Sequence, residues 1–183
     1  MRPAGSVAGD ERLRLFLALR LPDAVLDRIV EWQPAALSGG RLVRRENLHV
    51  TLAFLGHRPR DELDGILEAL RETAAEAAPI VLGPARYRET RSVGMLVLDD
   101  RDAHAGAFAR DLHERLERLG VYKPEKRAWL PHLTVLRFRE PPRLRPEPPP
   151  LEPFVPSDAA AYLSRLSPSG AQYEVLESFA LGG

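Results

Sequence analysis

Residues 48–55 read LHVTLAFL, in which His49 and Thr51 alternate with leucine and valine. Side chains two positions apart on a β-strand point to the same face of the sheet. His49 and Thr51 therefore share one face, and the aliphatic side chains beside them share the other. We expect Gly56 to end this strand. The stretch predicts a half-buried strand that buries its aliphatic face and shows an imidazole and a hydroxyl on the other.

The same pattern recurs 83 residues later, where His132-Leu133-Thr134-Val135 lies within a second predicted strand, residues 130–138. His132 and Thr134 again share one face, with aliphatic side chains behind them. The chain has only five histidines, so two such pairs are a specific signal. If the two strands lie side by side, or face each other from two lobes, two histidines and two threonines converge on one cleft.

Phosphodiester cleavage is the chemistry that suits such a cleft. Opening a cyclic phosphate requires a base that deprotonates the attacking water and an acid that protonates the departing ribose oxygen. Imidazole has an unperturbed pKa near 6.5, so one ring can be neutral while the other is protonated near neutral pH. Threonine hydroxyls can donate hydrogen bonds to the phosphate oxygens, whose charge grows in the transition state.

A metal site is disfavoured by the same residues. Two histidines and two threonines lack the third strong ligand that a zinc site usually has, and neither an HExxH motif nor a carboxylate cluster supplies it. The chain has no cysteine, which excludes a thiolate nucleophile, a disulfide scaffold and a cysteine-ligated metal. We therefore expect no metal and no other cofactor.

The apolar patterns around the two motifs predict a mixed α+β fold with largely antiparallel sheets. We expect the first helix to end at Pro34 and Gly120 to cap the third helix. The predicted strands cover residues 12–21, 48–55, 80–87, 92–98, 130–138, 154–166 and 172–181, and the predicted helices cover residues 23–33, 60–78 and 102–119.

Composition predicts one domain at residues 11–183, after a disordered N-terminal arm at residues 1–10. Residues about 140–156 are dense in proline and predict an extended surface loop, to which we assign no chemistry. Net charge is zero, from 26 basic and 26 acidic residues, so contact with RNA should be confined to a chain end held in a pocket. No apolar run approaches the roughly 20 residues that span a bilayer. We expect a cytoplasmic monomer without an obligate protein partner.

Four segments carry a family resemblance: RLRLFLALRLP (residues 12–22), ENLHVTLAFLG (46–56), PHLTVLRF (131–138) and YLSRLSPSGAQYEVLESFAL (162–181). They resemble the bacterial RNA 2',3'-cyclic phosphodiesterases, also described as 2'-5' RNA ligases, within the two-histidine (2H) phosphoesterase superfamily. The paired His-x-Thr-x motifs are typical of the superfamily. The FLG after the first motif and the SPSGAQYE segment are typical of the family.

The resemblance implies a bilobal two-histidine phosphoesterase fold, with antiparallel sheets flanked by helices around a central cleft. It implies an enzyme that hydrolyses RNA 2',3'-cyclic phosphate ends to 2'-phosphate ends. In that reaction His49 is implied to be the proton donor to the leaving oxygen, and His132 the proton acceptor that activates water. The residues implied to bind substrate are Thr51, Thr134 and Arg137 on the phosphate and Phe16 against a base.

Arg137 does not fit this role on a regular strand. It has the parity of Leu133 and Val135, not of His132, and so should point away from the cleft. It can reach a phosphate only if the strand ends, twists or bulges near it.

The sequence leaves several alternatives open. The same histidines could join RNA ends through a 2'-5' linkage, or could hydrolyse another small cyclic phosphate. A non-catalytic module that binds nucleotides or RNA ends is the alternative from a different class. Trp129, beside the second motif, could stack on a base or belong to the core.

Overall fold

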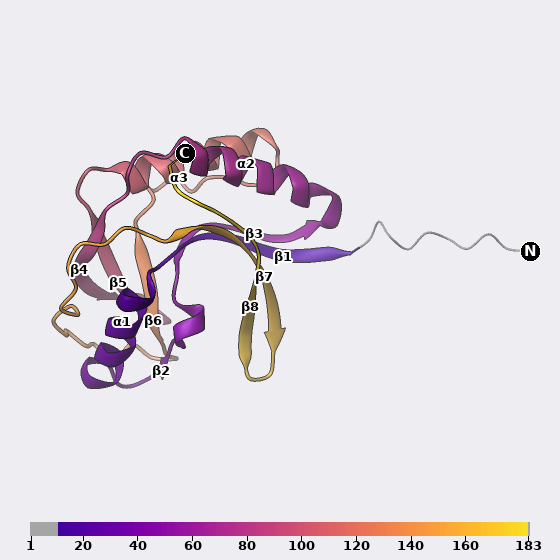
Figure 1. Ribbon diagram of the computed structural model, residues 1–183. Coiled ribbons are helices and arrows are strands. Elements are labelled where there is room, and N and C mark those ends of the chain that lie inside the picture. Colours follow the sequence, from indigo (N-terminus) through magenta and orange to yellow (C-terminus); the bar gives the residue numbers. More distant parts are fainter. Residues whose placement is uncertain (1–10, 183) are drawn as a thin grey trace, which may run out of the picture.

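Residues 11–182 are described by a computed structural model, and the predicted N-terminal arm, residues 1–10, lies outside them. These residues form one sheet of eight strands with three α-helices and two short 3-10 helices (Figure 1). None of the helices described is long and apolar enough to cross a membrane. In chain order the elements are β1 (Arg12–Arg20), α1 (Asp23–Ala36), β2 (Arg41–Leu42), η1 (Arg45–Asn47), β3 (Val50–Pro59), η2 (Arg60–Glu62), α2 (Leu63–Ala75), β4 (Leu82–Glu89), β5 (Val93–Asp100), α3 (His104–Arg118), β6 (His132–Arg137), β7 (Asp158–Ser167) and β8 (Gly170–Phe179).

The sheet has two halves that meet at a single residue pair. Its strand order is β4-β5-β6-β3-β1-β7-β8, with β2 also paired to β6, and every pairing is antiparallel. In the middle of this order, β3 and β6 pair only through Val50 and Leu133. Figure 1 shows β4, β5 and β6 on one side of the molecule and β1, β7 and β8 on the other. The predicted α+β class with two lobes around a cleft is confirmed.

Both faces of β1 are buried over residues 15–19. The leucines at alternate positions of β1 join the large core cluster that packs against the helices. Phe16 and Ala18, which lie between those leucines, face the opposite side and form a small cluster with Ala160 and Tyr162 of β7. This second cluster lies on the face of the sheet that turns towards the cleft. It gives the cleft a floor of packed aromatic side chains.

Gly56 does not end the strand as predicted. It lies inside β3, which continues to Pro59, and its φ is 68°. The register between β1 and β3 shifts there, because Leu15 pairs with Gly56 while Phe16 pairs with Phe54. One residue of β3 is therefore extra, and glycine supplies the positive φ that this bulge needs.

Pro34 does not end the first helix either. It lies in the last turn of α1, which continues to Ala36. A proline there removes one N–H donor from the helix, and the next turn still closes because Leu37 donates its N–H to the Gln33 carbonyl at 2.8 Å. The second predicted helix differs at both ends, since residues 60–62 form the 3-10 helix η2 and α2 ends at Ala75.

Gly120 ends α3 as predicted, in the left-handed conformation with φ 72°. Gly120 donates its N–H to the Glu117 carbonyl at 2.9 Å, and Val121 donates to the Leu116 carbonyl at 3.1 Å. These two bonds form a Schellman motif, which satisfies two carbonyls that a helix end leaves open.

Replacing Gly120 with alanine should lower the free energy of unfolding by about 1 kcal/mol, because the left-handed conformation costs an L-residue about that much. Apart from Gly120 and its two chain neighbours, no heavy atom of the described residues lies within 4 Å of the added Cβ, so we expect no steric clash. Gly65→Ala is the matched control: it lies inside α2, and its Cβ would meet Leu119 at 3.8 Å, an ordinary contact. Alanine there should add up to about 1 kcal/mol through helix propensity. Urea unfolding measures both variants, and shifts of the same sign would contradict the argument.

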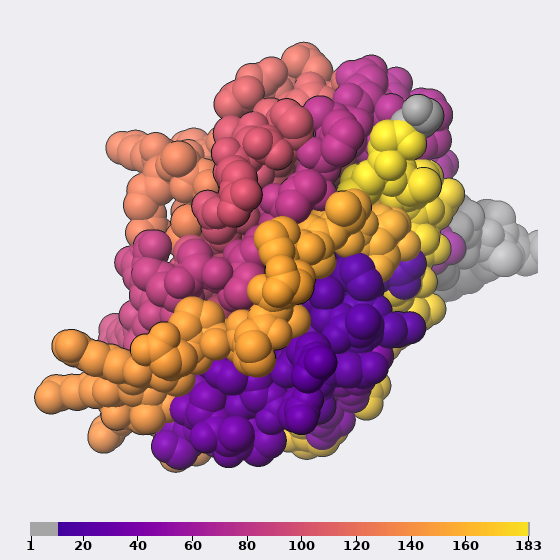
Figure 2. Space-filling view, turned by 60° about the vertical axis from the view of Figure 1, so that its left-hand side comes forward, coloured from indigo at the N-terminus to yellow at the C-terminus, as the bar shows by residue number. Residues whose placement is uncertain are grey.

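The proline-rich residues 140–156 have one isolated bridge, between Phe154 and Leu82, and otherwise no regular structure. Figure 2 shows this orange segment crossing the surface beside the indigo and purple N-terminal part of the fold. Trp32 donates its Nε1–H to the Glu147 carbonyl at 3.0 Å. The Glu89 carboxylate accepts the backbone N–H groups of residues 143 and 144 at 2.9 and 2.8 Å. The segment is thus tied to helix α1 and to strand β4.

Candidate active site

The Val50–Leu133 pair brings the two His-x-Thr motifs together. Both side chains are 0% exposed and belong to the main core. Their neighbours on each strand must therefore point to the opposite face. In an antiparallel pair, the residue before one partner lies beside the residue after the other. His49 thus lies across from Thr134, and Thr51 across from His132.

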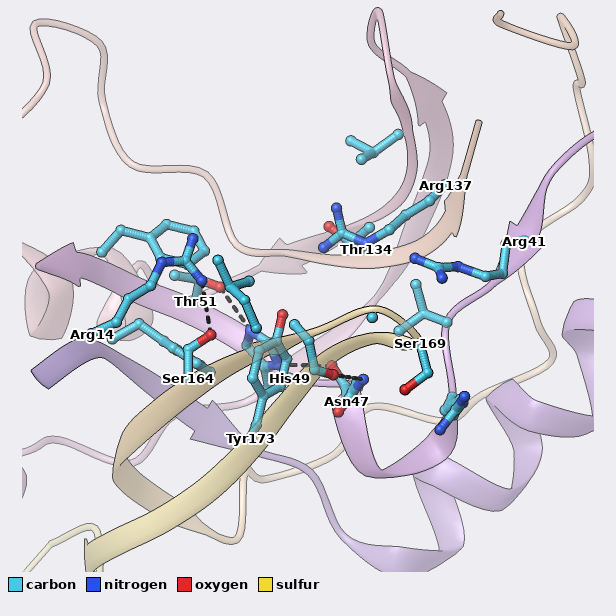
Figure 3. A pocket seen from close by; sticks show the side chains of 18 of the residues that line it. Arg14, Arg41, Asn47, His49, Thr51, Thr134, Arg137, Ser164, Ser169 and Tyr173 are labelled. Atoms are coloured by element: carbon cyan, nitrogen blue, oxygen red, sulfur yellow. Dashed lines mark hydrogen bonds between the residues drawn. The ribbon is translucent and has the colours of Figure 1, made fainter. Parts of the chain in front are cut away.

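One cavity of about 670 Å³ contains all four motif residues. Figure 3 shows His49, Thr51 and Thr134 directed towards it. His132 is the first residue of β6, whereas His49 directly precedes β3 instead of lying inside it as predicted. The lining residues are Arg14, Leu15, Phe16, Arg41, Leu42, Val43, Arg44, Asn47, His49, Thr51, Phe54, Gly56, Val93, His132, Thr134, Arg137, Ser164, Leu166, Ser169, Gly170, Ala171 and Tyr173.

Both imidazoles are held in the same way. His49 Nδ1 lies 2.8 Å from the Asn47 carbonyl oxygen, and His132 Nδ1 lies 2.8 Å from the Leu130 carbonyl oxygen. A carbonyl only accepts, so each Nδ1 carries a hydrogen and Nε2 is the nitrogen left for the cleft. In the neutral ring, His49 Nε2 accepts the Thr51 hydroxyl hydrogen, with the two atoms 3.0 Å apart. The fold therefore presents Nε2 of both histidines to a substrate.

Trp129 supports the site from behind. It is partly buried against the main core, and its Nε1–H donates to the Thr51 carbonyl at 3.0 Å. This bond connects the chain just before the second motif to the strand that carries the first. Of the two interpretations left open by the sequence, the structure favours the core position over base stacking.

Arg137 reaches the cavity because β6 bulges. Thr134 pairs with Met95 and Leu136 with Gly94, so Val135 is an extra residue in β6. Val135 and Leu136 are both 0% exposed, and the alternation is shifted by one position after them. Arg137 consequently lies on the same side as Thr134, as Figure 3 shows. The condition that the sequence set for Arg137 is met in the structure.

Phe16 lines the cavity, but its ring is buried in the cavity floor. Its ring is 1% exposed, stacks on Tyr162 with centroids 4.7 Å apart, and lies 4.9 Å from the His49 ring. Tyr173 closes its edge at 4.8 Å. Phe16 thus forms the floor beneath His49, and its faces are covered by protein instead of being free for a base.

The pKa of His49 is lowered to about 4, mainly by burial of the ring. The hydrogen bond to Asn47 opposes this shift, and the nearby charges of Arg137 and His132 add to it. In the free protein His49 is therefore neutral at pH 7. Among the described residues that line the cavity none is acidic, so the site itself offers no counter-charge. An anion between the two histidines would supply it and favour the imidazolium.

Sequence patterns alone did not identify three further lining residues, Arg14, Phe54 and Ser164. Arg14 could have been found, because it shares the strand parity of Phe16 on β1. Phe54 directly opposes Phe16 across β1 and β3 and is 64% exposed. Its position depends on the two bulges between these strands, which local patterns do not reveal.

No metal cluster is present in the part of the chain that the structure describes, since no three histidine, aspartate or glutamate side chains gather there.

Comparison with known proteins connects this geometry to one family. The family model of the 2'-5' RNA ligase superfamily matches residues 21–169. The chain is 35% identical over 189 residues to an RNA 2',3'-cyclic phosphodiesterase of Thermus thermophilus, covering 93% of this chain and 91% of that protein. It is 25% identical to an RNA 2',3'-cyclic phosphodiesterase of Methanocaldococcus jannaschii, covering 91% of this chain and all of that protein.

Solved structures show the same fold. The crystal structure of TT0787 of Thermus thermophilus aligns with a TM-score of 0.76 and 30% identity, covering 92% of this chain and 98% of that one. Apo LigT of Escherichia coli aligns with a TM-score of 0.77 and 24% identity, covering 95% of this chain and all of that one. LigT has also been crystallised with 3'-AMP and with phosphate.

Proposed function

This chain belongs to the 2'-5' RNA ligase superfamily, and we propose that it hydrolyses RNA 2',3'-cyclic phosphate ends to 2'-phosphate ends. The observation that carries the proposal is the single Val50–Leu133 pair, which sets two His-x-Thr motifs side by side in one cavity. Relatives that align over nearly the whole chain are RNA 2',3'-cyclic phosphodiesterases. A cyclic phosphodiester suits a site with two imidazoles, which can act as acid and base, and two hydroxyls, which can donate hydrogen bonds to phosphate oxygens.

The mechanism uses one histidine on each side of the phosphate. Nε2 of His132 takes a proton from water, and the water oxygen attacks phosphorus. The bond from phosphorus to the ribose 3' oxygen breaks, and His49 Nε2 gives its proton to that oxygen. The product has a 2'-phosphate and a free 3'-hydroxyl. Atoms and charge balance without a further reactant.

Substrate binding also explains how a donor with a pKa of about 4 becomes protonated. The cyclic phosphodiester carries a negative charge, which opposes the effect of Arg137 and His132 on the His49 ring. Protonation of His49 is thus coupled to binding. Because burial keeps the imidazolium unstable relative to the neutral ring, the protonated form transfers its proton readily once the 3' oxygen departs.

The remaining polar groups suit the non-bridging oxygens. Thr51 and Thr134 place hydroxyls on opposite sides of the Val50–Leu133 pair, and Arg137 adds a positive charge beside Thr134. Hydrogen bonds to these oxygens strengthen as negative charge accumulates in the transition state. We assign the base of the terminal nucleotide to the exposed ring of Phe54 in place of the buried Phe16, because base stacking needs a free ring face.

The direct test incubates the protein, with EDTA present, with a short RNA that ends in a 2',3'-cyclic phosphate. We expect multiple turnovers and a 2'-phosphate end, identified by mass spectrometry and by resistance to a 3'-specific phosphatase. A 3'-phosphate end would overturn the assignment of His49 to the 3' oxygen. RNA products joined through 2'-5' linkages would show ligation instead. Saturable binding without turnover, with or without added divalent metal, would show a binding module and defeat the proposal.

A further inference from the structure

The cavity is strongly basic although the chain as a whole is neutral. Four arginines line it: Arg14, Arg41, Arg44 and Arg137. Among the described lining residues none carries a carboxylate, whereas the chain has as many acidic as basic residues. In the proposed mechanism only one of these arginines, Arg137, contacts the reacting phosphate. The cavity therefore holds more positive charge than one phosphodiester needs.

Arg14 differs from the others in how it is held. It projects from β1 at the middle of the sheet, is only partly exposed, and donates from Nη1 to the Ser164 hydroxyl at 2.8 Å. Figure 3 places Arg14 and Ser164 on one side of His49, and Arg41 on the other. The bond to a neutral hydroxyl fixes the guanidinium and leaves its charge uncompensated, which suits an anion.

A second hollow begins where Arg14 stands. It has a volume of about 230 Å³ and shares Arg14, Ser164 and Leu166 with the main cavity. Arg12 and Arg165 line it as well, together with one acidic residue, Glu11. The cleft thus continues past Arg14, over a rim in which basic residues outnumber the acidic one. A chain that entered the main cavity would have a path out at this end.

Along β1, Arg14 lies beyond Phe54 as seen from Thr51. Ala18 pairs with Thr51, and Arg14 lies four residues away on the same face. At about 3.3 Å per residue the two backbone positions are about 13 Å apart. This is longer than the distance between neighbouring phosphates of an RNA strand, so the long Arg14 side chain has to span part of it. Phe54 lies between them on the adjacent strand, opposite Phe16. A phosphate at Thr51 and a base on Phe54 would direct the next phosphate of the strand towards Arg14.

We propose that Arg14, positioned by Ser164, binds the phosphodiester that joins the last two nucleotides of the RNA, so that the site prefers an oligonucleotide end to a mononucleotide cyclic phosphate. This inference rests on the proposed function. It adds a specificity determinant outside the two motifs. It also gives the bound RNA a direction, from the histidines over Phe54 and Arg14 into the second hollow.

The test compares kcat/KM for cytidine 2',3'-cyclic phosphate with kcat/KM for a trinucleotide that ends in the same group. The wild-type protein should prefer the trinucleotide roughly tenfold or more, the usual effect of one hydrogen-bonded charge. Arg14→Gln should remove most of that preference, mainly through KM, and Arg14→Lys should retain part of it. Ser164→Ala should weaken the preference less. Arg110→Gln, on the exposed side of α3, is the control that should change neither substrate.

Salt dependence gives a second readout that general loss of structure would not mimic. Each phosphate contact on a single strand contributes about 0.7 to the slope of log affinity against log salt. For the trinucleotide, Arg14→Gln should reduce the slope of log KM against log salt concentration by about 0.7. Arg110→Gln should leave this slope unchanged.

The possible outcomes separate this inference from the proposed function. No turnover of either substrate by the wild-type protein would defeat the proposed function itself. Turnover of both substrates with equal kcat/KM would leave the function intact and overturn the role of Arg14. If Arg14→Gln left the preference for the trinucleotide intact and Arg41→Gln removed it, the proposed direction of the RNA in the cleft would be wrong.

Discussion

Replacing either His49 or His132 with alanine should lower kcat on an RNA 2',3'-cyclic phosphate by at least about 100-fold, because each general acid or base contributes on that order. Both rings present Nε2 to the same cavity and are fixed through Nδ1 by a backbone carbonyl at 2.8 Å. The double variant should be only slightly slower than either single variant, since the two groups act in one step. Single-turnover kinetics with saturating protein measures the effect apart from binding.

The assignment of donor and acceptor can be separated with a synthetic substrate. A phosphodiester with a p-nitrophenyl leaving group needs little protonation of the departing oxygen, so loss of the acid matters less than loss of the base. His49→Ala should therefore recover much of its activity on this substrate, whereas His132→Ala should stay slow. The reverse pattern would exchange the two roles. His104→Ala, at the start of α3, is the matched control that should change neither rate.

Near-normal kcat in a folded His49→Ala or His132→Ala protein would refute the two-histidine mechanism. Thermal unfolding of each variant checks that the fold is retained. Val50 and Leu133, which set the geometry, are untouched by either change.

Local patterns predicted the parts of the site, and long-range pairing determined how they meet. Alternation in the two His-x-Thr segments correctly assigned their buried and cleft faces. The register between Val50 and Leu133 joins strands that lie far apart in sequence, and no local pattern encodes it. The family resemblance indicated the convergence of the motifs, but a single residue pair between the halves appears only in the folded chain.

The sequence predicts the positions of Arg137 and Phe16 less directly than those of the motif residues, for two different physical reasons. Arg137 depended on the extra residue Val135, and a bulge is set by the partner strand β5 as much as by β6. For Phe16 the sequence holds a further signal, because β1 is apolar at alternate leucines and also at Phe16 and Ala18 between them. A strand apolar on both faces is usually buried on both. That pattern indicates a core aromatic side chain instead of an exposed base platform.

His49 should titrate near pH 4 in the free protein, far below the usual 6.5 of imidazole, mainly because the ring is buried. The unfolded chain binds the proton already near pH 6.5, so between pH 6.5 and 4 it holds more protons than the folded chain. The contribution of His49 to stability is thus complete above pH 6.5 and is lost as pH falls towards 4. NMR of the imidazole Cε1–H, assigned with His49→Asn, measures the midpoint. Added phosphate should raise this midpoint, and a midpoint near 6.5 without ligand would contradict the burial of the His49 ring.

Phe16 and Phe54 should differ in how much each ring contributes to the free energy of unfolding. The two rings are 5.7 Å apart, yet Phe16 is 1% exposed and Phe54 is 64% exposed. Phe16→Ala should lower the free energy of unfolding by about 3–5 kcal/mol, the usual cost of removing a buried ring. Phe54→Ala should change it by no more than about 0.5 kcal/mol. Urea unfolding distinguishes the two, and equal losses would refute the burial difference on which the argument depends.

Substitutions at Phe16 and Phe54 should also affect different kinetic parameters. Phe16→Leu keeps an apolar floor but admits water beneath His49, so the pKa of the ring should rise towards 6.5 and kcat should change while KM is nearly retained. Phe54→Ala should raise KM by roughly tenfold through loss of base stacking and leave the His49 titration in place. If Phe16→Leu instead raised KM without moving the His49 midpoint, Phe16 would contact the base after all. Burial would then describe only the empty cleft, with the ring uncovered when RNA binds.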